Sequence, residues 1–255
     1  MKQPKLELLS PAGSWEALEA AVRSGADAVY LGGSLFSARA NAQNFDHDTL
    51  KQAVAYCHAR GVKVHLAVNT ILLNHEIEPA LDFVAFACTL PVDAVIVQDT
   101  GLLHLLRQAA PTLQIHASTQ MSVHTPEGAK LLAEQGVSRV VLARELSLKE
   151  IKEISRALKD GGFAHVEIEH FVHGALCMSV SGQCYFSSLL GSRSGNRGQC
   201  AQTCRLPFSA KGGTGYDLSL KDLSMLERLG ELADAGVTSF TIEGRMTRPE
   251  YVAAP

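Results

Sequence analysis

Four cysteines lie close together in the second half of the chain, in the pattern C-x6-C-x15-C-x3-C formed by Cys177, Cys184, Cys200 and Cys204. Thiolates are soft ligands that suit iron–sulfur clusters and zinc, and four of them complete either a cubane or a tetrahedral site. Structural zinc sites favour closely paired cysteines, and only Cys200 and Cys204 are so paired. The spacing therefore favours an iron–sulfur cluster of the 4Fe–4S type, with zinc as the alternative.

The other two cysteines have a different setting. Cys57, in AVAYCHAR, and Cys88, in FVAFACTL, lie on apolar faces of predicted helices, and we expect both in the hydrophobic core. The N-terminus has no apolar run of signal-peptide length, and no apolar stretch is long enough to span a membrane. We therefore expect a cytoplasmic protein with no membrane partner, in which the thiols do not form disulfides.

Two titratable residues precede the first clustered cysteine. Glu169 and His173 end a predicted strand just before Cys177, which suggests a catalytic acid–base role or tuning of the cluster. A Cys177–His173 nucleophile pair, as in a cysteine peptidase, is the alternative, but four clustered thiols argue for ligation. The chain has neither a G-x-S-x-G elbow nor an H-E-x-x-H helix.

Four further polar residues end, or closely follow, other predicted strands, and we expect them to bind substrate: Arg39, Gln120, Arg144 and Arg245. Guanidinium groups bind carboxylates through two parallel hydrogen bonds, so the three arginines suit a dicarboxylate. The alternative is that they form ion pairs with Glu145 and Glu243.

Runs rich in Val, Ile and Leu alternate with amphipathic stretches, a pattern typical of parallel strands separated by helices. The predicted strands are 6–12, 26–33, 63–70, 93–99, 114–120, 138–145, 165–174 and 239–245. The predicted helices cover about 14–24, 46–59, 76–89, 101–109, 125–135, 147–160 and 222–235. Their expected N-caps are Ser14, Asp46, Thr125 and Ser147, and glycines that end helices precede several strands.

This order predicts an α/β protein with one (β/α)8 barrel domain over 1–255, whose last helix is truncated. A doubly wound sheet is disfavoured because SPAGSWEA, after the first strand, lacks the G-x-G-x-x-G spacing. A long cysteine-bearing loop follows the seventh strand, and we expect it to form a cluster-binding insertion at about 174–215. It lies at the face where barrels carry their active sites.

Overall charge does not indicate a polyanionic partner, because the formal net charge is -3 and the pI is about 6.4. The cysteine segment is locally basic through Arg193, Arg197 and Arg205. These residues either guide a phosphate backbone towards the barrel or balance the thiolates.

Several stretches resemble one known family. EHFVHGALC from Glu169 and GQCYFS from Gly182 resemble the signature of the collagenase-like peptidases, a family of unassigned catalytic type, with Phe186 as the one departure. LELLSPAG, GADAVYLGG, RSGNRGQCAQTCR, SLKDLS and IEGRMTRPEYVA are similar to that family as well. The resemblance covers nearly the whole chain and is greatest to the branch of prephenate-dependent 23S rRNA 5-hydroxycytidine synthases.

The resemblance implies an iron–sulfur enzyme that hydroxylates a base of rRNA or tRNA without molecular oxygen, with prephenate as the hydroxyl donor. The family name implies the alternative, a peptidase, and a non-catalytic scaffold stabilised by metal is the third possibility. Some relatives have Cys where this chain has Ser224, so Cys204 is the expected fourth ligand unless another segment supplies one. That branch also carries a C-terminal extension, which we expect this chain to lack. The sequence does not specify the oligomeric state.

Overall fold

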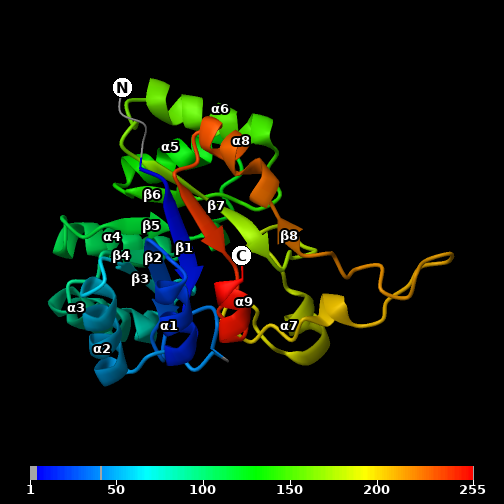
Figure 1. Cartoon of the computed structure of the whole chain (residues 1–255), viewed down its shortest axis with the longest axis horizontal. Coiled ribbons are helices and arrows are strands. Elements are labelled where there is room, and N and C mark those ends of the chain that lie inside the picture. The colour runs from blue at the N-terminus through cyan, green and yellow to red at the C-terminus, as the bar shows by residue number, and fades with distance from the viewer. Residues whose placement is uncertain (1–4, 41, 255) are drawn as a thin grey trace.

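The computed structural model describes residues 5–40 and 42–254, so residues 1–4, 41 and 255 of the predicted domain lie outside it. Its parallel strands follow one another around a closed barrel in which β6 pairs with β7, β7 with β9, and β9 with β1 (Figure 1). They are β1 Glu7–Pro11, β2 Ala28–Gly32, β3 Lys63–Val68, β4 Ala94–Val97, β5 Ile115–Ala117, β6 Arg139–Val141, β7 Glu167–Gly174 and β9 Ser239–Ile242. The predicted (β/α)8 barrel is confirmed.

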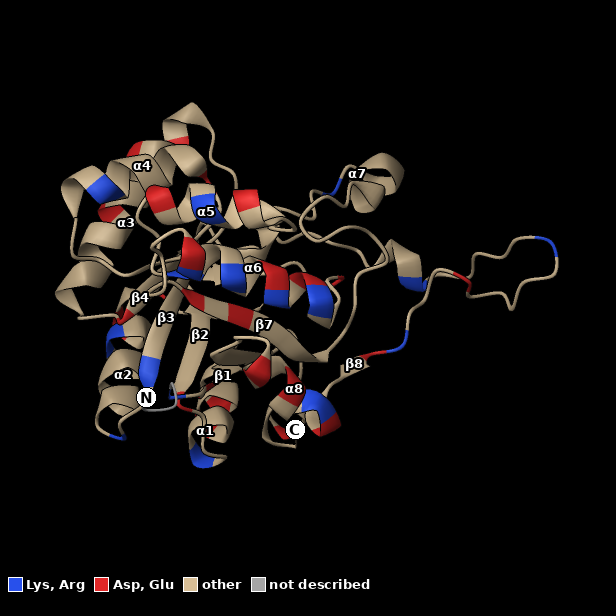
Figure 2. Cartoon of the chain, turned by 90° about the horizontal axis from the view of Figure 1, so that it is seen from above, with Lys and Arg blue, Asp and Glu red and all other residues tan. Residues whose placement is uncertain are grey.

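Helices cover the outside of the barrel. They are α1 Trp15–Arg23, α2 His47–His58, α3 Ile77–Thr89, α4 Thr100–Ala109, α5 Pro126–Glu134, α6 Leu148–Asp160, α8 Leu229–Asp234 and α9 Pro249–Ala253, with short 3-10 turns at Asn74–Glu76, Thr119–Met121, Thr203–Arg205 and Leu226–Arg228. All four predicted N-caps accept a hydrogen bond from the first turn of their helix. Charged residues of both signs lie on the outer helices, α6 among them (Figure 2).

The prediction of a single helix over 222–235 was wrong. Its first part forms the short strand β8, Leu223–Ser224, which pairs antiparallel with the end of β7, and the backbone N–H of Met225 donates to Val172 O at 2.9 Å. Only Leu229–Asp234 is α-helical. The structure also contains α7, Phe186–Gly191, a helix within the cysteine segment that the sequence patterns did not indicate.

The expectations for the two isolated cysteines had different outcomes. Cys57 is fully buried, and burial raises the pKa of its thiol to about 12. Cys88 is exposed, so its assignment to the core was wrong. The buried stripe of α3 runs through Ala80, Val84 and Ala87, and Cys88 lies just beside it in the last turn.

A buried ion cluster closes the N-terminal end of the barrel. Arg139, at the start of β6, donates to Glu7 of β1 at 2.6 Å and to Glu169 of β7 at 3.2 Å, and it also pairs with Glu167. Because β1 and β6 are not neighbours, the Glu7 contact crosses the barrel interior. Burial favours the neutral form of Glu7, but the hydrogen bond and charge of Arg139 outweigh it and bring the pKa to about 2.

Two histidines fill the interior beside this cluster. The rings of His65 and His116 meet edge to face with centroids 4.7 Å apart, and both side chains are buried. Burial lowers the pKa of His65 to about 4 and that of His116 well below its ordinary value, so both are neutral at physiological pH. None of the described helices has the length and apolarity needed to cross a bilayer.

We predict that His65→Gln flattens the loss of stability in acid. The pKa of His65 is about 4 in the folded protein against 6.5 ordinarily, so the unfolded chain binds more protons between these values. The stabilisation is complete above about pH 6.5 and is lost, by roughly 3 kcal/mol, as the pH falls through 4. Urea unfolding across this range measures the slope. The exposed His75→Gln is the control, and an equal slope in wild type and His65→Gln would refute the prediction.

Candidate functional site

A cavity of about 650 Å³ opens at the C-terminal end of the barrel strands. Strand residues form its floor, among them Tyr30 of β2, Val141 of β6 and Phe171 of β7. The segment between β7 and β8, residues 175–222, forms the other wall and projects from the body of the molecule in Figure 1. This is the face at which (β/α)8 barrels bind their substrates.

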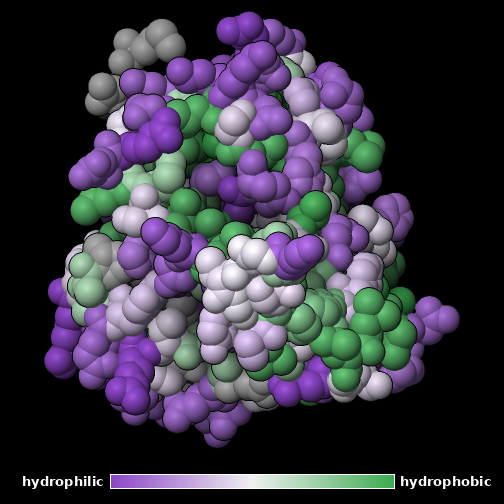
Figure 3. Space-filling view, turned by 90° about the vertical axis from the view of Figure 1, so that its right-hand side faces the viewer, coloured by the Kyte–Doolittle hydropathy of each residue, from purple (hydrophilic) through white to green (hydrophobic). Residues whose placement is uncertain are grey.

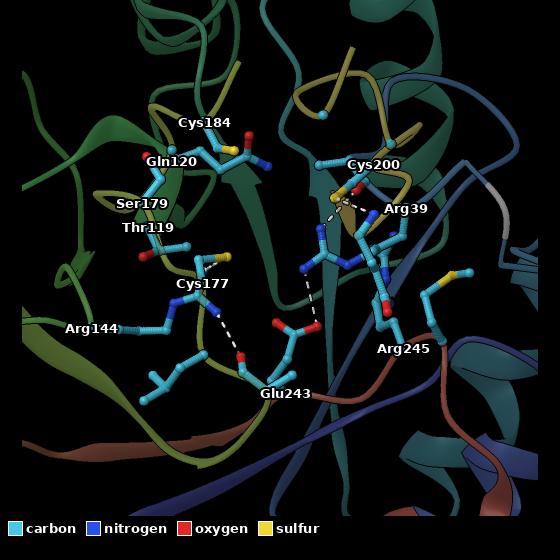
Figure 4. A pocket seen from close by; sticks show the side chains of 18 of the residues that line it. Arg39, Thr119, Gln120, Arg144, Cys177, Ser179, Cys184, Cys200, Glu243 and Arg245 are labelled. Carbon is cyan, nitrogen blue, oxygen red and sulfur yellow. Dashed lines mark hydrogen bonds and ion pairs between the residues drawn. The ribbon is translucent and has the colours of Figure 1, made fainter. Parts of the chain in front are cut away.

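All four predicted cysteine ligands line this cavity: Cys177, Cys184, Cys200 and Cys204. Figure 4 shows Cys177 and Cys184 on one side of the open space and Cys200 on the other. Burial raises the pKa of Cys204, the charge of Arg205 lowers it, and the charges of Cys200, Cys177 and Cys184 raise it further.

As placed, no group of three or more His, Cys, Asp or Glu side chains within the described residues is arranged to hold a metal ion. A single tetrahedral ion with bonds of about 2.3 Å would require the thiols to converge closely. A cubane holds its four thiolates further apart, because irons and bridging sulfides lie between them. The donor set is four thiols without histidine or carboxylate, which is the chemistry that an iron–sulfur cluster requires.

Glu145 anchors the segment between the first two cysteines. Its carboxylate accepts from Ser181 N at 2.8 Å, from Ser181 Oγ at 2.7 Å and from His124 Nε2 at 2.8 Å. Burial opposes ionisation of Glu145, but these hydrogen bonds bring its pKa to about 2. Gly182 follows with a φ of 79°, and a Cβ there would lie 2.5 Å from Gln120 O. Only glycine allows this close approach to the barrel.

A second anchor holds the segment before Cys200. Asn196 accepts from Ile71 N at 3.0 Å, and Arg197 forms an ion pair with Glu76. A Cβ at Gly195 would lie 4.0 Å from the Cβ of Cys200 and 3.6 Å from Cys184 O, so this glycine leaves space between the two cysteines.

The arginines of the segment therefore serve mainly to shape it. Arg197 binds Glu76, while Arg205 donates to Leu176 O at 3.1 Å and to Ser219 Oγ at 3.0 Å. Arg193, which is exposed, donates to Gln199 O at 3.0 Å. The two roles predicted for these residues, phosphate guidance and balance of the thiolates, stay predictions, and the charge of Arg205 lowers the pKa of Cys204.

The three arginines predicted to bind substrate all line the cavity. Arg39 pairs with Glu243 at 3.1 Å, and that carboxylate raises the pKa of Arg39. Arg144 lies with its guanidinium carbon 5.2 Å from the Phe171 ring centroid, and it donates to Cys177 Sγ at 3.3 Å. Arg144 is thus directed to a thiol instead of to Glu145.

Arg245 differs from the other two. It is almost fully buried and donates to Ser37 Oγ, and its Nε, like that of Arg144, has no partner within the described part of the chain. Burial, together with the charge of Arg39, lowers the pKa of Arg245 to about 10. A buried cation without a carboxylate partner is costly, and it is stabilised when an anion occupies the cavity beside it.

The structure separates Glu169 and His173. Glu169 lines the cavity, but it is the third residue of the long strand β7 and lies at the cavity floor, where it accepts from Thr241 Oγ1 at 2.8 Å. Burial raises its pKa. The strand register shifts between Phe171 and His173, and the His173 ring packs against Tyr251, with centroids 5.4 Å apart. His173 is therefore not among the described residues that line the cavity.

Two further features were not anticipated. Asn196 and Tyr30 line the cavity, and Asn196 lies inside the RSGNRGQC motif, which was the only signal for it. Several exposed apolar side chains line the cavity: Met178, Val180, Tyr185 and Leu189. Figure 3 shows apolar side chains gathered on this face.

Comparison with known proteins agrees with the motifs. The model of peptidase family U32 matches residues 13–254. The 23S rRNA 5-hydroxycytidine C2501 synthase of Escherichia coli K12 is 45% identical over 97% of this chain and 38% of its own length. The tRNA hydroxylation protein P1 of Bacillus subtilis 168 is 34% identical over 98% of this chain and 61% of its own length. The chain thus spans less than two thirds of these relatives.

A solved U32 peptidase has the same fold. It superposes with a TM-score of 0.66 over 96% of this chain and 95% of its own, at 16% sequence identity. At this identity the likeness supports the barrel architecture and nothing more about chemistry.

We predict that Gly182→Ala loosens the cysteine segment. The added methyl would clash with the backbone of Gln120, and the left-handed backbone would be strained as well. Gly162→Ala is the matched control, because its φ is 85° and nothing lies within 4 Å of a Cβ there. We expect the control to lose about 1 kcal/mol and Gly182→Ala about 1–3 kcal/mol more.

Urea unfolding measures both losses of stability. The rate at which Cys184 reacts with a thiol reagent in metal-free protein measures how loosely the cysteine segment is held. Equal stability and equal thiol reactivity in the two variants would contradict the prediction.

Proposed function

The chain belongs to peptidase family U32, and from this membership and the composition of its cavity we propose that it is an iron–sulfur hydroxylase of an RNA base. The favoured substrate is a cytidine of 23S rRNA, with tRNA as the other candidate, because relatives named for hydroxylation of each match almost the whole chain. The observation that carries the proposal is the presence of four thiols and three arginines around one cavity. An RNA substrate is in keeping with a cytoplasmic enzyme.

Cys177, Cys184, Cys200 and Cys204 would hold a 4Fe–4S cluster, with zinc as the alternative ion. Three donors already point at their sulfurs: Arg144 at Cys177 at 3.3 Å, and the backbone N–H of Gln202 and Ser187 Oγ at Cys200 at 3.4 and 3.9 Å. Hydrogen bonds to thiolates are one way in which a protein sets the potential of a cluster. When bound, the cluster would supply electron transfer.

Arg245 and Arg144 would bind the hydroxyl donor, for which prephenate, a dicarboxylate, fits the cations of the cavity. In net terms a C–H bond of the base becomes C–OH, while the donor loses its hydroxyl and gains hydrogen. Glu169 lies at the floor with its pKa raised by burial, and would be the group that moves a proton during the reaction. His173 would act only indirectly, through its packing against Tyr251.

The peptidase alternative finds less support in the geometry. It requires a nucleophile and a base in contact, yet His173 packs against Tyr251 and lies outside the cavity that Cys177 lines. A non-catalytic scaffold would not need an unpaired arginine in a large cavity.

We predict that Cys177→Ala, Cys184→Ala and Cys200→Ala each remove most of the iron and abolish hydroxylation. Cys57→Ala is the control, because it deletes only a buried core atom and should reduce stability by about 1–2 kcal/mol. Iron, sulfide and visible absorption after anaerobic purification test this. Full iron content in the three variants, or its loss in Cys57→Ala, would show that the ligands are wrongly assigned.

We predict that Arg245→Ala raises the KM for prephenate about tenfold or more while leaving iron content intact, because the arginine supplies a charge-assisted contact to a carboxylate. Arg144→Ala should also raise the KM for prephenate. Because Arg144 donates to Cys177 Sγ, we expect this variant to lose some iron as well. Arg23→Ala, an exposed residue in the last turn of α1, is the control. Unchanged donor dependence in both cavity variants would remove prephenate from the proposal.

A further inference from the structure

Three amide side chains form a connected network at the cavity, and two of them line it: Gln98 after β4, Gln120 after β5, and Asn196 in the cysteine segment. Asn196 Nδ2 donates to Gln120 Oε1 at 2.9 Å and also to Gln98 Oε1. Gln98 Nε2 in turn donates to Gln120 O at 3.3 Å.

The orientation of every amide in this network follows from one backbone group. An amide can usually be turned over, exchanging its oxygen and nitrogen, without a change of shape. Here Asn196 Oδ1 accepts from Ile71 N at 3.0 Å, and a backbone N–H can only donate. The oxygen of Asn196 must therefore face Ile71, its nitrogen must face the two glutamines, and each glutamine must present its oxygen to Asn196.

The free end of Gln120 is consequently a hydrogen-bond donor. Its oxygen is used by Asn196, and within the described residues no acceptor is hydrogen-bonded to its Nε2. Figure 4 shows the Gln120 side chain reaching into the open space of the cavity. A ligand in this position is therefore required to offer acceptors.

From this geometry we infer that Gln120 determines which base the cavity accepts, and that it selects cytosine over uracil. The inference rests on the proposed function. Cytosine N3 is an acceptor for a hydrogen of Nε2, whereas uracil carries a hydrogen on N3 that would face this donor. Gln98 and Asn196 act as positioning residues, since they hold the donor end of Gln120 towards the cavity.

Gln120→Glu tests the donor directly. It keeps the oxygen that accepts from Asn196 but replaces both free hydrogens with a second acceptor. We expect the preference for cytidine over uridine to fall about 5- to 30-fold, the effect of losing one hydrogen bond to a buried partner. Gln108→Glu, on the exposed side of α4, introduces the same charge and should leave the preference unchanged.

Asn196→Asp tests the network without touching Gln120. Asp can still accept from Ile71 N but offers Gln120 only an oxygen, so Gln120 should turn over and present its own oxygen to the cavity. A merely structural role of Asn196 would weaken both bases equally. Reversed orientation instead predicts a selective gain of uridine relative to cytidine.

The probes are fluorescent single-stranded oligoadenosine RNAs that carry one central cytidine or uridine. Anisotropy gives their affinities, mass spectrometry of the digested RNA gives hydroxylation with prephenate, and iron content confirms that the site is intact. A lower cytidine preference in both variants, with wild-type iron, supports the inference. Wild-type protein that binds and modifies both bases equally overturns it and leaves hydroxylation standing. Wild-type protein that hydroxylates no base overturns the proposed function and this inference with it.

Discussion

The buried guanidinium of Arg139 is the contact on which the closed barrel depends. It binds carboxylates on β1 and β7, the two strands that flank β9, and also Ser239 of β9 itself. The last strand is thereby joined from inside to both of its neighbours. A guanidinium buried among three carboxylates is stable only if each hydrogen bond is made, so the cluster favours one register of the closing strands. Glu169 belongs both to this ion cluster and to the floor of the cavity, so the cluster also fixes the position of a cavity residue.

The cysteine segment is held in place by a different kind of contact. It contributes little to the apolar core, and its position is set by polar contacts with loops that follow the strands: Glu145 with Ser181, Glu76 with Arg197, and Ile71 with Asn196. In the segment these anchors lie between successive cysteines, and all four cysteines line the cavity. The barrel thus supplies the rigid frame, and the segment supplies the ligands.

The barrel could be predicted from the sequence, whereas the contacts of the cysteine segment could not. The strands of the barrel were recognisable because buried parallel strands need apolar runs and surface helices need amphipathic ones, and the cap residues Ser14 and Asp46 marked helix starts. The register shift before His173 leaves no trace in the residue pattern, so its side chain was expected on the wrong side. The role of Asn196 depends on a backbone group more than a hundred residues away, which no local pattern can reveal.

The outermost part of the cysteine segment is stabilised by its own hydrogen bonds. Residues 206–222 form an arm that projects in Figure 1, and its turn is held internally, with Asp217 accepting from Ala210 N at 3.0 Å and Thr214 N at 2.7 Å. The tip of the arm, residues 210–217, satisfies its own backbone and can change length without disturbing the contact that Arg205 makes with Ser219. Insertions and deletions can therefore accumulate at this tip while the lining of the cavity stays the same.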